Sequence, residues 1–299
     1  MTASKKTNPL SQWAALLTSP RRTPTAIAML LALAVVVVAL VWNHVKEHVR
    51  DSGRYTVTLE QINVTPLPAW IHTDVRADVF RNASLDAPRS TLDDDDLADR
   101  IARAFSLHPW VAKVVRVAPA TWRLDDRPRI DVELVYRRPV CMVESRGELL
   151  PVDVEGVLLP SGDFSPNEKL AYPCLWGIET SPLAPVGQRW GDGRVVEGAE
   201  IAAALAAAWQ PLRLFRIQPA PRIVPAAAVE NSYTLFTRAG TRIFWGLAPS
   251  TKAIDEPSAA EKVARLLQYV AERGTLEGRD GPQQLDVRNL PAAKGSAGK

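Results

Sequence analysis

The sequence predicts an α+β protein with a single transmembrane helix near its amino terminus, followed by two folded domains. Three observations lead to this prediction. An uninterrupted apolar run lies close to the start of the chain, segments with helical and strand periodicity alternate after it, and the second half contains short strand-like segments separated by turn residues. A chain of 299 residues has room for two modest domains beside a membrane segment, at about 100 to 200 residues per domain.

The apolar run extends from Ala26 to Trp42 and is followed by polar Asn43 and His44. It is near the lower limit of length for crossing about 30 Å of hydrocarbon. A cleaved signal peptide is the alternative interpretation, but bulky residues end the run and no small-residue cleavage site follows it. We therefore expect a transmembrane helix over residues 26–45 and a juxtamembrane stem over residues 46–54.

The distribution of charge predicts the orientation of this helix. Four cations and no acid precede the run, whereas cations and acids balance directly behind it. Because positive charge marks the cytoplasmic side, residues 1–25 are expected to form a cytoplasmic basic tail and the main domains to lie outside the cytoplasm. The cations are Lys5, Lys6, Arg21 and Arg22. They account for the net charge of +3, so no basic domain for nucleic acid remains.

Residues 55–140 are expected to form a domain with the order strand, helix, helix, strand, strand. The second helix, residues 91–105, has Leu97, Ile101 and Phe105 on one face. It begins with four aspartates, which suit the positive end of a helix dipole, whereas a calcium loop would need a ligand spacing that is missing. The predicted elements are strands 55–64, 111–117 and 130–136 and helices 70–80 and 91–105. Such a unit can bury one sheet face beneath two helices.

Residues 141–290 are expected to form one β-rich mixed domain, and residues 291–299 a flexible tail. A helix starting at Pro257 should present Ala260, Val263, Ala264, Leu267 and Val270 to the core. The other expected elements are the strand-rich segment 140–159, a helix over 195–209, a strand over 212–217 and a hairpin of strands 233–237 and 241–245.

The residue inventory contains no recognisable catalytic or cofactor site. Only four histidines are present, and no nucleophile motif accompanies them. Asp153 and Glu155 resemble a carboxylate pair for sugar chemistry, but a pair flanking a turn is the preferred interpretation. Cys141 and Cys174 either pair outside the cytoplasm or stay as two buried thiols, since spacing alone does not decide. We therefore expect no enzyme, no cofactor, no metal and no small-molecule substrate.

Several short motifs, taken in order, resemble the FtsQ/DivIB cell-division family. His108-Pro109-Trp110-Val111 is similar to the short motif that precedes the second strand of the family's POTRA domain. Residues 132–140 resemble the strand that leads out of that domain. Residues 150–160 are similar to its "lvD-x-x-G-x-v-l-p" hairpin. Lys262 within a helix and Leu285-Asp286-Val287-Arg288 resemble its closing helix and "iDlR" strand. Residues 118–129 depart from the family by lengthening the connection before the third strand.

This resemblance implies a POTRA domain over 55–140, an FtsQ-type domain over 141–290, and a scaffold in the inner, cytoplasmic membrane. Such a scaffold binds small bitopic division proteins and other divisome components and helps to coordinate septum formation at the division site. A POTRA-bearing assembly or translocation component is the alternative function. An outer-membrane barrel is disfavoured by the amino-terminal helix.

Two partner-binding surfaces are expected. The first is the acidic outer side of the 91–105 helix, with Asp95, Asp99 and the cation Arg103 off the apolar stripe. The second is the closing strand, whose free edge can accept a strand from a partner. There Val287 should pack inward, and Arg288 should either bind an acidic residue of the partner or only solvate the edge. The hairpin 233–245 is the alternative location of this free edge.

Overall fold

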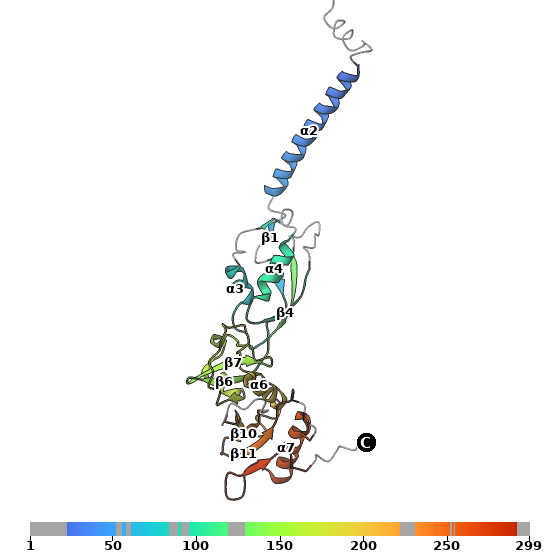
Figure 1. Cartoon of the computed structure of the whole chain (residues 1–299). Helices are drawn as coiled ribbons and strands as arrows, with labels where there is room; N and C mark the ends of the chain where they lie inside the picture. Colours follow the sequence, from blue (N-terminus) through green and yellow to red (C-terminus); the bar gives the residue numbers. More distant parts are fainter. Residues whose placement is uncertain are drawn as a thin grey trace, which may run out of the picture.

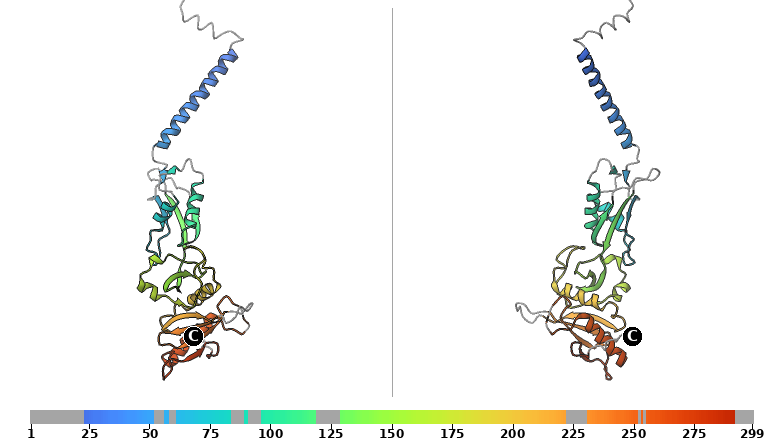
Figure 2. Two further views of the ribbon diagram at one scale, coloured as in Figure 1. Left: turned by 60° about the vertical axis from the view of Figure 1, so that its left-hand side comes forward. Right: turned by 90° about the vertical axis from the view of Figure 1, so that its right-hand side faces the viewer.

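The computed structural model describes residues 23–51, 56–57, 61–83, 89–90, 96–118, 129–221, 231–251, 253 and 255–291. Its elements follow one another along the molecule, from helix α2 at one end to helix α7 at the other (Figure 1). Both views in Figure 2 keep this order. The predicted mixed composition is present, since one long amino-terminal helix precedes a sheet-rich body. We call the part from β1 to β5 the proximal unit and the part from β6 to β12 the distal unit.

Helix α2, Thr23–Asp51, is long and apolar enough to cross a membrane. It has 29 residues, and its window Ile27–His44 has a mean hydropathy of 2.3 with no residue buried. The predicted span is therefore helical, which is consistent with a single-pass membrane protein. The helix also continues through residues 46–51, which we expected to be a stem, because no glycine or proline interrupts it before Gly53. Most of the predicted tail, residues 1–22, lies outside the described residues.

The proximal unit contains a three-stranded sheet in the order β2-β5-β4. Strand β2 is parallel to β5, and β4 is antiparallel to it. The predicted strands at 111–117 and 130–136 are confirmed without a shift at either end. The elements are β1 Thr56–Val57, β2 Ile62–Val64, α3 Val75–Asn82, β3 Arg89–Ser90, α4 Leu97–Ser106, β4 Val111–Val117 and β5 Ile130–Tyr136, with β1 and β3 forming a separate antiparallel pair.

The two helices of the proximal unit bury the side chains that the apolar pattern predicts, but their starting points differ from the prediction. Leu97, Ile101 and Phe105 of α4 are all buried. Helix α3 begins at Val75 rather than at residue 70, because the Asp74 side chain accepts the Ala77 N–H and caps the helix there. The expected first turn of α4, residues 91–95, and the inserted segment 119–128 lie outside the described residues.

The distal unit is built on a seven-stranded sheet in the order β12-β11-β10-β9-β8-β6-β7. The predicted hairpin is confirmed as β10 and β11, and the β-rich segment after residue 139 as the hairpin of β6 and β7. The elements are β6 Pro139–Ser145, β7 Glu148–Asp153, η2 Ser161–Asp163, α5 Pro166–Ala171, β8 Cys174–Leu175, α6 Gly193–Leu205, β9 Leu214–Pro219, β10 Tyr233–Thr237, β11 Arg242–Gly246, α7 Ala259–Arg273 and β12 Gln284–Asp286. Helix α6 therefore starts and ends earlier than predicted, and β9 starts two residues later.

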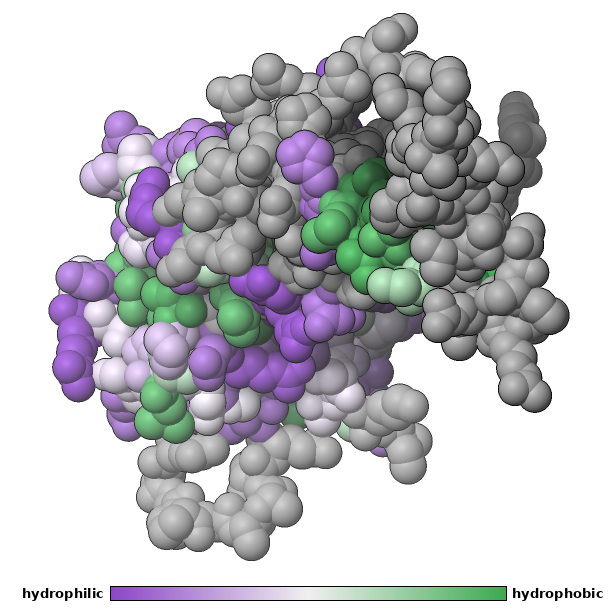
Figure 3. All heavy atoms as spheres, turned by 90° about the horizontal axis from the view of Figure 1, so that it is seen from above, coloured by the Kyte–Doolittle hydropathy of each residue, from purple (hydrophilic) through white to green (hydrophobic). Residues whose placement is uncertain are grey.

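The two faces of this sheet have different surroundings. Leu175, Ile217, Leu235 and Ile243 occupy matching positions on neighbouring strands and are buried in one core with residues of α6 and α7. On the opposite face, Met142 of β6 packs into the core of the proximal unit. Towards the other edge, this outer face carries half-buried and exposed side chains. Seen from the α2 end, hydrophilic side chains cover most of the coloured surface, with apolar side chains in a few patches (Figure 3).

A cluster of hydrogen bonds around Asp163 connects the two units. The Trp110 Nε1–H donates to Asp163 Oδ2 at 2.6 Å, and both residues are buried. The Thr73 hydroxyl donates to the other carboxylate oxygen, and His72 Nδ1 lies 2.7 Å from the Asp163 carbonyl oxygen. Because a carbonyl only accepts, this His72 nitrogen carries the proton. These contacts hold residues 72 and 73 outside α3, where the sequence pattern predicted helix.

His108 supports the same junction in its neutral form. Its Nδ1 accepts the Trp110 N–H at 3.2 Å, which requires an unprotonated nitrogen. Burial lowers the pKa of His108 from its ordinary value, although Asp78 and Asp163 oppose the shift. A histidine whose pKa is lower in the folded chain destabilises that chain as the pH falls below the unfolded value of about 6.5.

We expect the stability of the protein to fall between pH 7.5 and pH 5.5, and substitution His108→Asn to reduce this loss. An asparagine oxygen accepts the same N–H without titrating. Denaturant unfolding of the full chain in detergent, followed by tryptophan fluorescence at both pH values, measures the difference. An equal loss in the variant and in the unsubstituted protein would contradict this role for His108.

Candidate partner-binding site

The closing strand β12 lies at one edge of the seven-stranded sheet and pairs with β11 alone. The Arg242 N–H donates to the Gln283 oxygen at 2.9 Å, and the Val287 N–H donates to the Phe244 oxygen at 3.2 Å. In a parallel ladder, the intervening residues Gln284 and Asp286 then direct their backbone groups away from β11. The Asp286 oxygen accepts the Asn289 N–H at 3.1 Å. The backbone N–H and C=O of Gln284 and the backbone N–H of Asp286 therefore remain at the outer edge, with no bond to any described residue.

The alternative location of the free edge, the hairpin 233–245, is wrong. Strand β10 lies between β9 and β11, and β11 lies between β10 and β12, so both have a neighbour on each side. The opposite edge of the sheet is β7. There the backbone at Pro151 and Asp153 is already bonded to Leu159 and Val157, at 2.9 and 3.1 Å. The closing strand therefore has the more open edge of the two.

The four predicted residues of the closing strand occupy different environments. Val287 is fully buried, as predicted, and Leu285 packs against the same core while half-buried. The strand itself ends at Asp286, so the expectation that residues 287 and 288 extend it is wrong. The Asp286 side chain accepts the Arg288 N–H at 3.0 Å, and this local bond turns the chain away from the sheet.

Arg288 already has partners within the chain. Its guanidinium donates to both carboxylate oxygens of Asp286, at 3.1 and 2.9 Å, and lies 4.5 Å from the ring centre of Phe244. These hydrogen bonds lower the pKa of Asp286 and raise the pKa of Arg288. The Arg288 side chain also lies 3.9 Å from Glu256 Oε2 and is still 38% exposed, so an acidic residue of a partner can reach it only by sharing it with these two acids.

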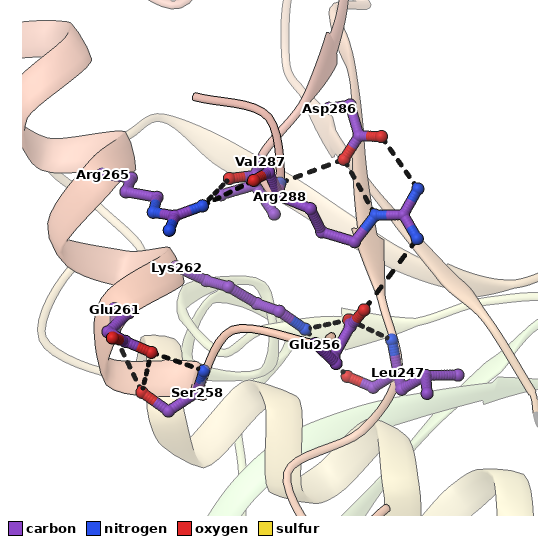
Figure 4. Close-up of polar contacts among 9 residues, drawn as sticks. All are labelled: Leu247, Glu256, Ser258, Glu261, Lys262, Arg265, Asp286, Val287 and Arg288. Carbon is purple, nitrogen blue, oxygen red and sulfur yellow. Dashed lines mark hydrogen bonds and ion pairs between the residues drawn. The ribbon is translucent and has the colours of Figure 1, made fainter. Parts of the chain in front are cut away.

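Lys262 of α7 is a buried cation directly behind the closing strand (Figure 4). Its Nζ lies 2.5 Å from Glu256 Oε1, donates to the Leu247 oxygen at 3.2 Å, and lies 4.9 Å from the ring centre of Trp245. The side chain is only 2% exposed, and this burial lowers the pKa of Lys262, while Glu256 opposes the shift. The ammonium therefore joins α7 to the end of β11.

Gly246 leaves room for this ion pair. A Cβ atom at this position would lie 2.1 Å from Glu256 Oε1, and the φ angle of +87° is one that glycine adopts readily. The same Glu256 oxygen accepts the Leu247 N–H at 2.8 Å. One carboxylate thus fixes both the backbone that follows β11 and the ammonium of Lys262.

Arg265, one turn further along α7, holds the end of the closing strand. Its Nη1 donates to the Arg288 oxygen at 2.6 Å and to the Val287 oxygen at 3.3 Å (Figure 4). Lys262 and Arg265 are neighbours on one helix face because they are three residues apart. Helix α7 therefore contacts both β11 and the residues after β12, which fixes the free edge in place.

The sequence located α7 but placed its buried face about one position away. Ala260 and Leu267, expected in the core, are exposed, whereas Lys262 and Leu266 are buried. The apolar pattern misses this because a lysine counts as polar even where an acid neutralises it. The sequence also missed Glu256 and Arg265. The usable signals were the position of Lys262 one turn before Leu266 and the spacing of Ser258 and Glu261, which form a capping box in the structure.

The other predicted surface is separate from this one. Asp99 and Arg103 are exposed on α4, where Arg103 Nε donates to the Asp99 backbone oxygen at 3.3 Å, and Asp95 lies outside the described residues. Helix α4 belongs to the proximal unit, and β12 to the far end of the distal unit. The structure therefore does not bring the two predicted surfaces together.

The two cysteines are free and lie on adjacent strands. Burial raises the pKa of Cys141, and it raises the pKa of Cys174 to about 12. Both are therefore protonated thiols at neutral pH in this structure. Among the described residues no group of three or more His, Cys, Asp and Glu side chains has a geometry that would hold a metal ion.

We expect Lys262→Met to destabilise the protein by about 3 to 5 kcal/mol, because it removes the nearest cation from the buried Glu256 carboxylate and leaves it only Arg288, at 3.9 Å. The double variant Lys262→Met with Glu256→Gln should recover part of this loss, since it removes both charges. Lys113→Met, at an exposed position on β4, is the control and should change stability by less than about 0.5 kcal/mol. Denaturant unfolding measures all three. A loss at Lys262 no larger than at Lys113 would refute the buried-pair interpretation.

No protein-family model and no curated protein matches this chain. A function for it therefore has to be proposed from its residues and from the geometry of its sheet edge.

Proposed function

We propose that this chain is a single-pass scaffold of the FtsQ/DivIB type in the cell-division machinery. It would bind other small membrane proteins outside the cytoplasm and help to coordinate septal wall synthesis. The observation that carries the proposal is the free edge of β12, which α7 fixes from behind through Lys262 and Arg265. This role requires no cofactor and no small-molecule substrate.

The arrangement of the proximal unit supports a POTRA-like assignment. Apart from the separate pair of β1 and β3, the elements follow the order strand, helix, helix, strand, strand that is expected of such a domain, and the last strand, β5, lies between β2 and β4 in the sheet. Trp110 of the resemblance motif is buried and bonded to Asp163, so the residues that suggested the family also join this unit to the next.

The edge of β12 supports recognition by strand addition. A partner segment that pairs with Gln284 and Asp286 would satisfy backbone groups that β11 leaves free. Because Leu285 and Val287 pack against the core, the edge is attached to the rigid part of the distal unit. A fixed edge binds at a lower entropic cost than one that must order on binding.

The first test of this proposal is Gln284→Pro, with Gln284→Ala as the matched control. Proline removes the outward N–H, whereas alanine keeps it, and neither disturbs a bond to β11. We expect Pro to lower co-purification of small membrane proteins with the full-length chain by about fivefold or more, and Ala to leave it unchanged. A fluorescent fusion of the Pro variant should also lose part of its midcell signal.

Unchanged partner recovery by a folded Pro variant would show that β12 is not the binding edge. Failure of the unsubstituted fusion to reach midcell in dividing cells would contradict the division role itself. A uniform envelope distribution would favour an assembly or translocation component instead.

The proposed localisation has its own test. We infer from the basic residues before α2 that the amino terminus lies in the cytoplasm and that both units lie outside it. Protease added to intact spheroplasts should therefore digest the distal unit and leave a short membrane-embedded fragment. Protection of the distal unit until the membrane is lysed would reverse the orientation.

A further inference from the structure

A row of side chains crosses the outer face of the distal sheet, opposite to α6 and α7. Strand register places Arg216 of β9 beside Phe236 of β10, and Phe236 beside Arg242 of β11. Trp176, directly after β8, lies on the same face and contacts Arg216. We call these four residues the arginine face. The matching inward positions hold the apolar core, so this row belongs to the side of the sheet that α6 and α7 leave uncovered.

The arginine face is held together by contacts between guanidinium groups and rings. Arg216 lies 4.3 Å from the ring centre of Phe236 and 5.6 Å from that of Trp176. Arg242 is exposed and lies 6.0 Å from the same Phe236 ring. Such contacts fix the direction of a guanidinium without neutralising its charge. The row is therefore an ordered pair of cations on a flat surface.

Neither arginine of this row has an acidic partner in the described part of the chain. Among the described residues of the distal unit, the two buried cations are paired, Arg194 with Asp192 at 2.8 Å and Lys262 with Glu256. The Arg216 Nε–H is, in addition, buried without a hydrogen-bond partner. Unpaired polar groups of this kind are uncommon in folded proteins, and they point to a missing acceptor.

Glu144 and Asp286, which lie on the same sheet face, already have partners within the chain. Glu144 accepts the Gly147 N–H at 2.9 Å, and Asp286 binds Arg288. The charge of Arg216 and Arg242 is therefore left for a group from outside the described chain. Guanidinium groups match carboxylates through paired, charge-assisted hydrogen bonds.

We propose that the arginine face binds an acidic peptide segment of another extracytoplasmic protein. Two observations favour this ligand over other anions. The rings of Trp176 and Phe236 already contact Arg216, whereas a sugar would need a bare ring to stack on. The face also lies in the distal unit, at the end of the molecule away from α2, so the lipid surface around α2 is out of its reach (Figure 1).

This site is independent of the strand edge on which the proposed function rests. Arg216 and Phe236 lie on interior strands, and their side chains stand on the face of the sheet rather than along its edge. A partner bound to β12 and an acidic segment on the arginine face would therefore occupy different surfaces. Loss of one interaction leaves the other measurable.

The test uses the full-length chain in nanodiscs of uncharged lipid and a fluorescent peptide of alternating Glu and Thr. Fluorescence anisotropy should show binding that weakens as salt is added. Arg216→Ala with Arg242→Ala should weaken it about tenfold, and the exposed single change Arg242→Glu should also weaken it. Arg273→Ala is the matched control, because Arg273 lies on α7 over Tyr269 and should leave binding unchanged.

Three outcomes would overturn the proposal. Binding of the double variant within twofold of the unsubstituted protein would exclude the arginine face. Equal binding of a peptide of alternating Lys and Thr would exclude recognition of carboxylates. Tighter, Arg216-dependent binding of a sulfated glycan would assign the face to a polysaccharide instead. The Gln284→Pro variant should bind the acidic peptide normally, which separates this result from the fate of the strand edge.

Discussion

The buried ion pair of Lys262 and Glu256 is the interaction on which the far end of the sheet depends. An ammonium and a carboxylate removed from water are stable only when each finds several partners, and here each does. The pair fixes the end of β11 to α7, and the same helix holds the residues after β12 through Arg265. A short terminal strand, which would otherwise fray, is thereby kept in register with the sheet.

The seven-stranded sheet uses its outer face in two ways. Next to β6 the face is covered by the proximal unit, and Met142 belongs to the core of that unit. From β9 to β11 the same face carries arginines and aromatic rings. This difference between the two parts of the face follows from the residues at the outward positions of the strands. An apolar side chain there is buried against the neighbouring unit, whereas a guanidinium group stays near water. One sheet thus serves both as an internal joint and as an outer surface.

Much of the secondary structure could be predicted from the sequence, because periodic apolar residues locate strands and helices. The strands at 111–117 and 130–136 and the stripe of Leu97, Ile101 and Phe105 show this. Predictions failed where side chains make long-range polar contacts. The residues before α3 are drawn into hydrogen bonds with Asp163, far away in sequence, and a buried lysine concealed the inner face of α7.

The candidate site was predictable in position but not in detail. A closing strand at a sheet edge follows from its place at the end of the domain, and the burial of Val287 follows from alternation. The engagement of Arg288 with Asp286 could not be predicted in the same way, because a local turn competes with an extended strand at a single residue. The sheet register that aligns Arg216 with Phe236 and Arg242 is likewise absent from any local pattern.

The bond between Trp110 and Asp163 also has a mechanical consequence. It ties the proximal unit to the distal unit through a buried contact. If the chain acts as the proposed scaffold, a partner anchored in the same membrane must extend its own chain past the proximal unit to reach the edge of β12. Under that proposal the joint would select partners by reach as well as by contact, and a pull on the distal sheet would pass through this bond to the proximal unit.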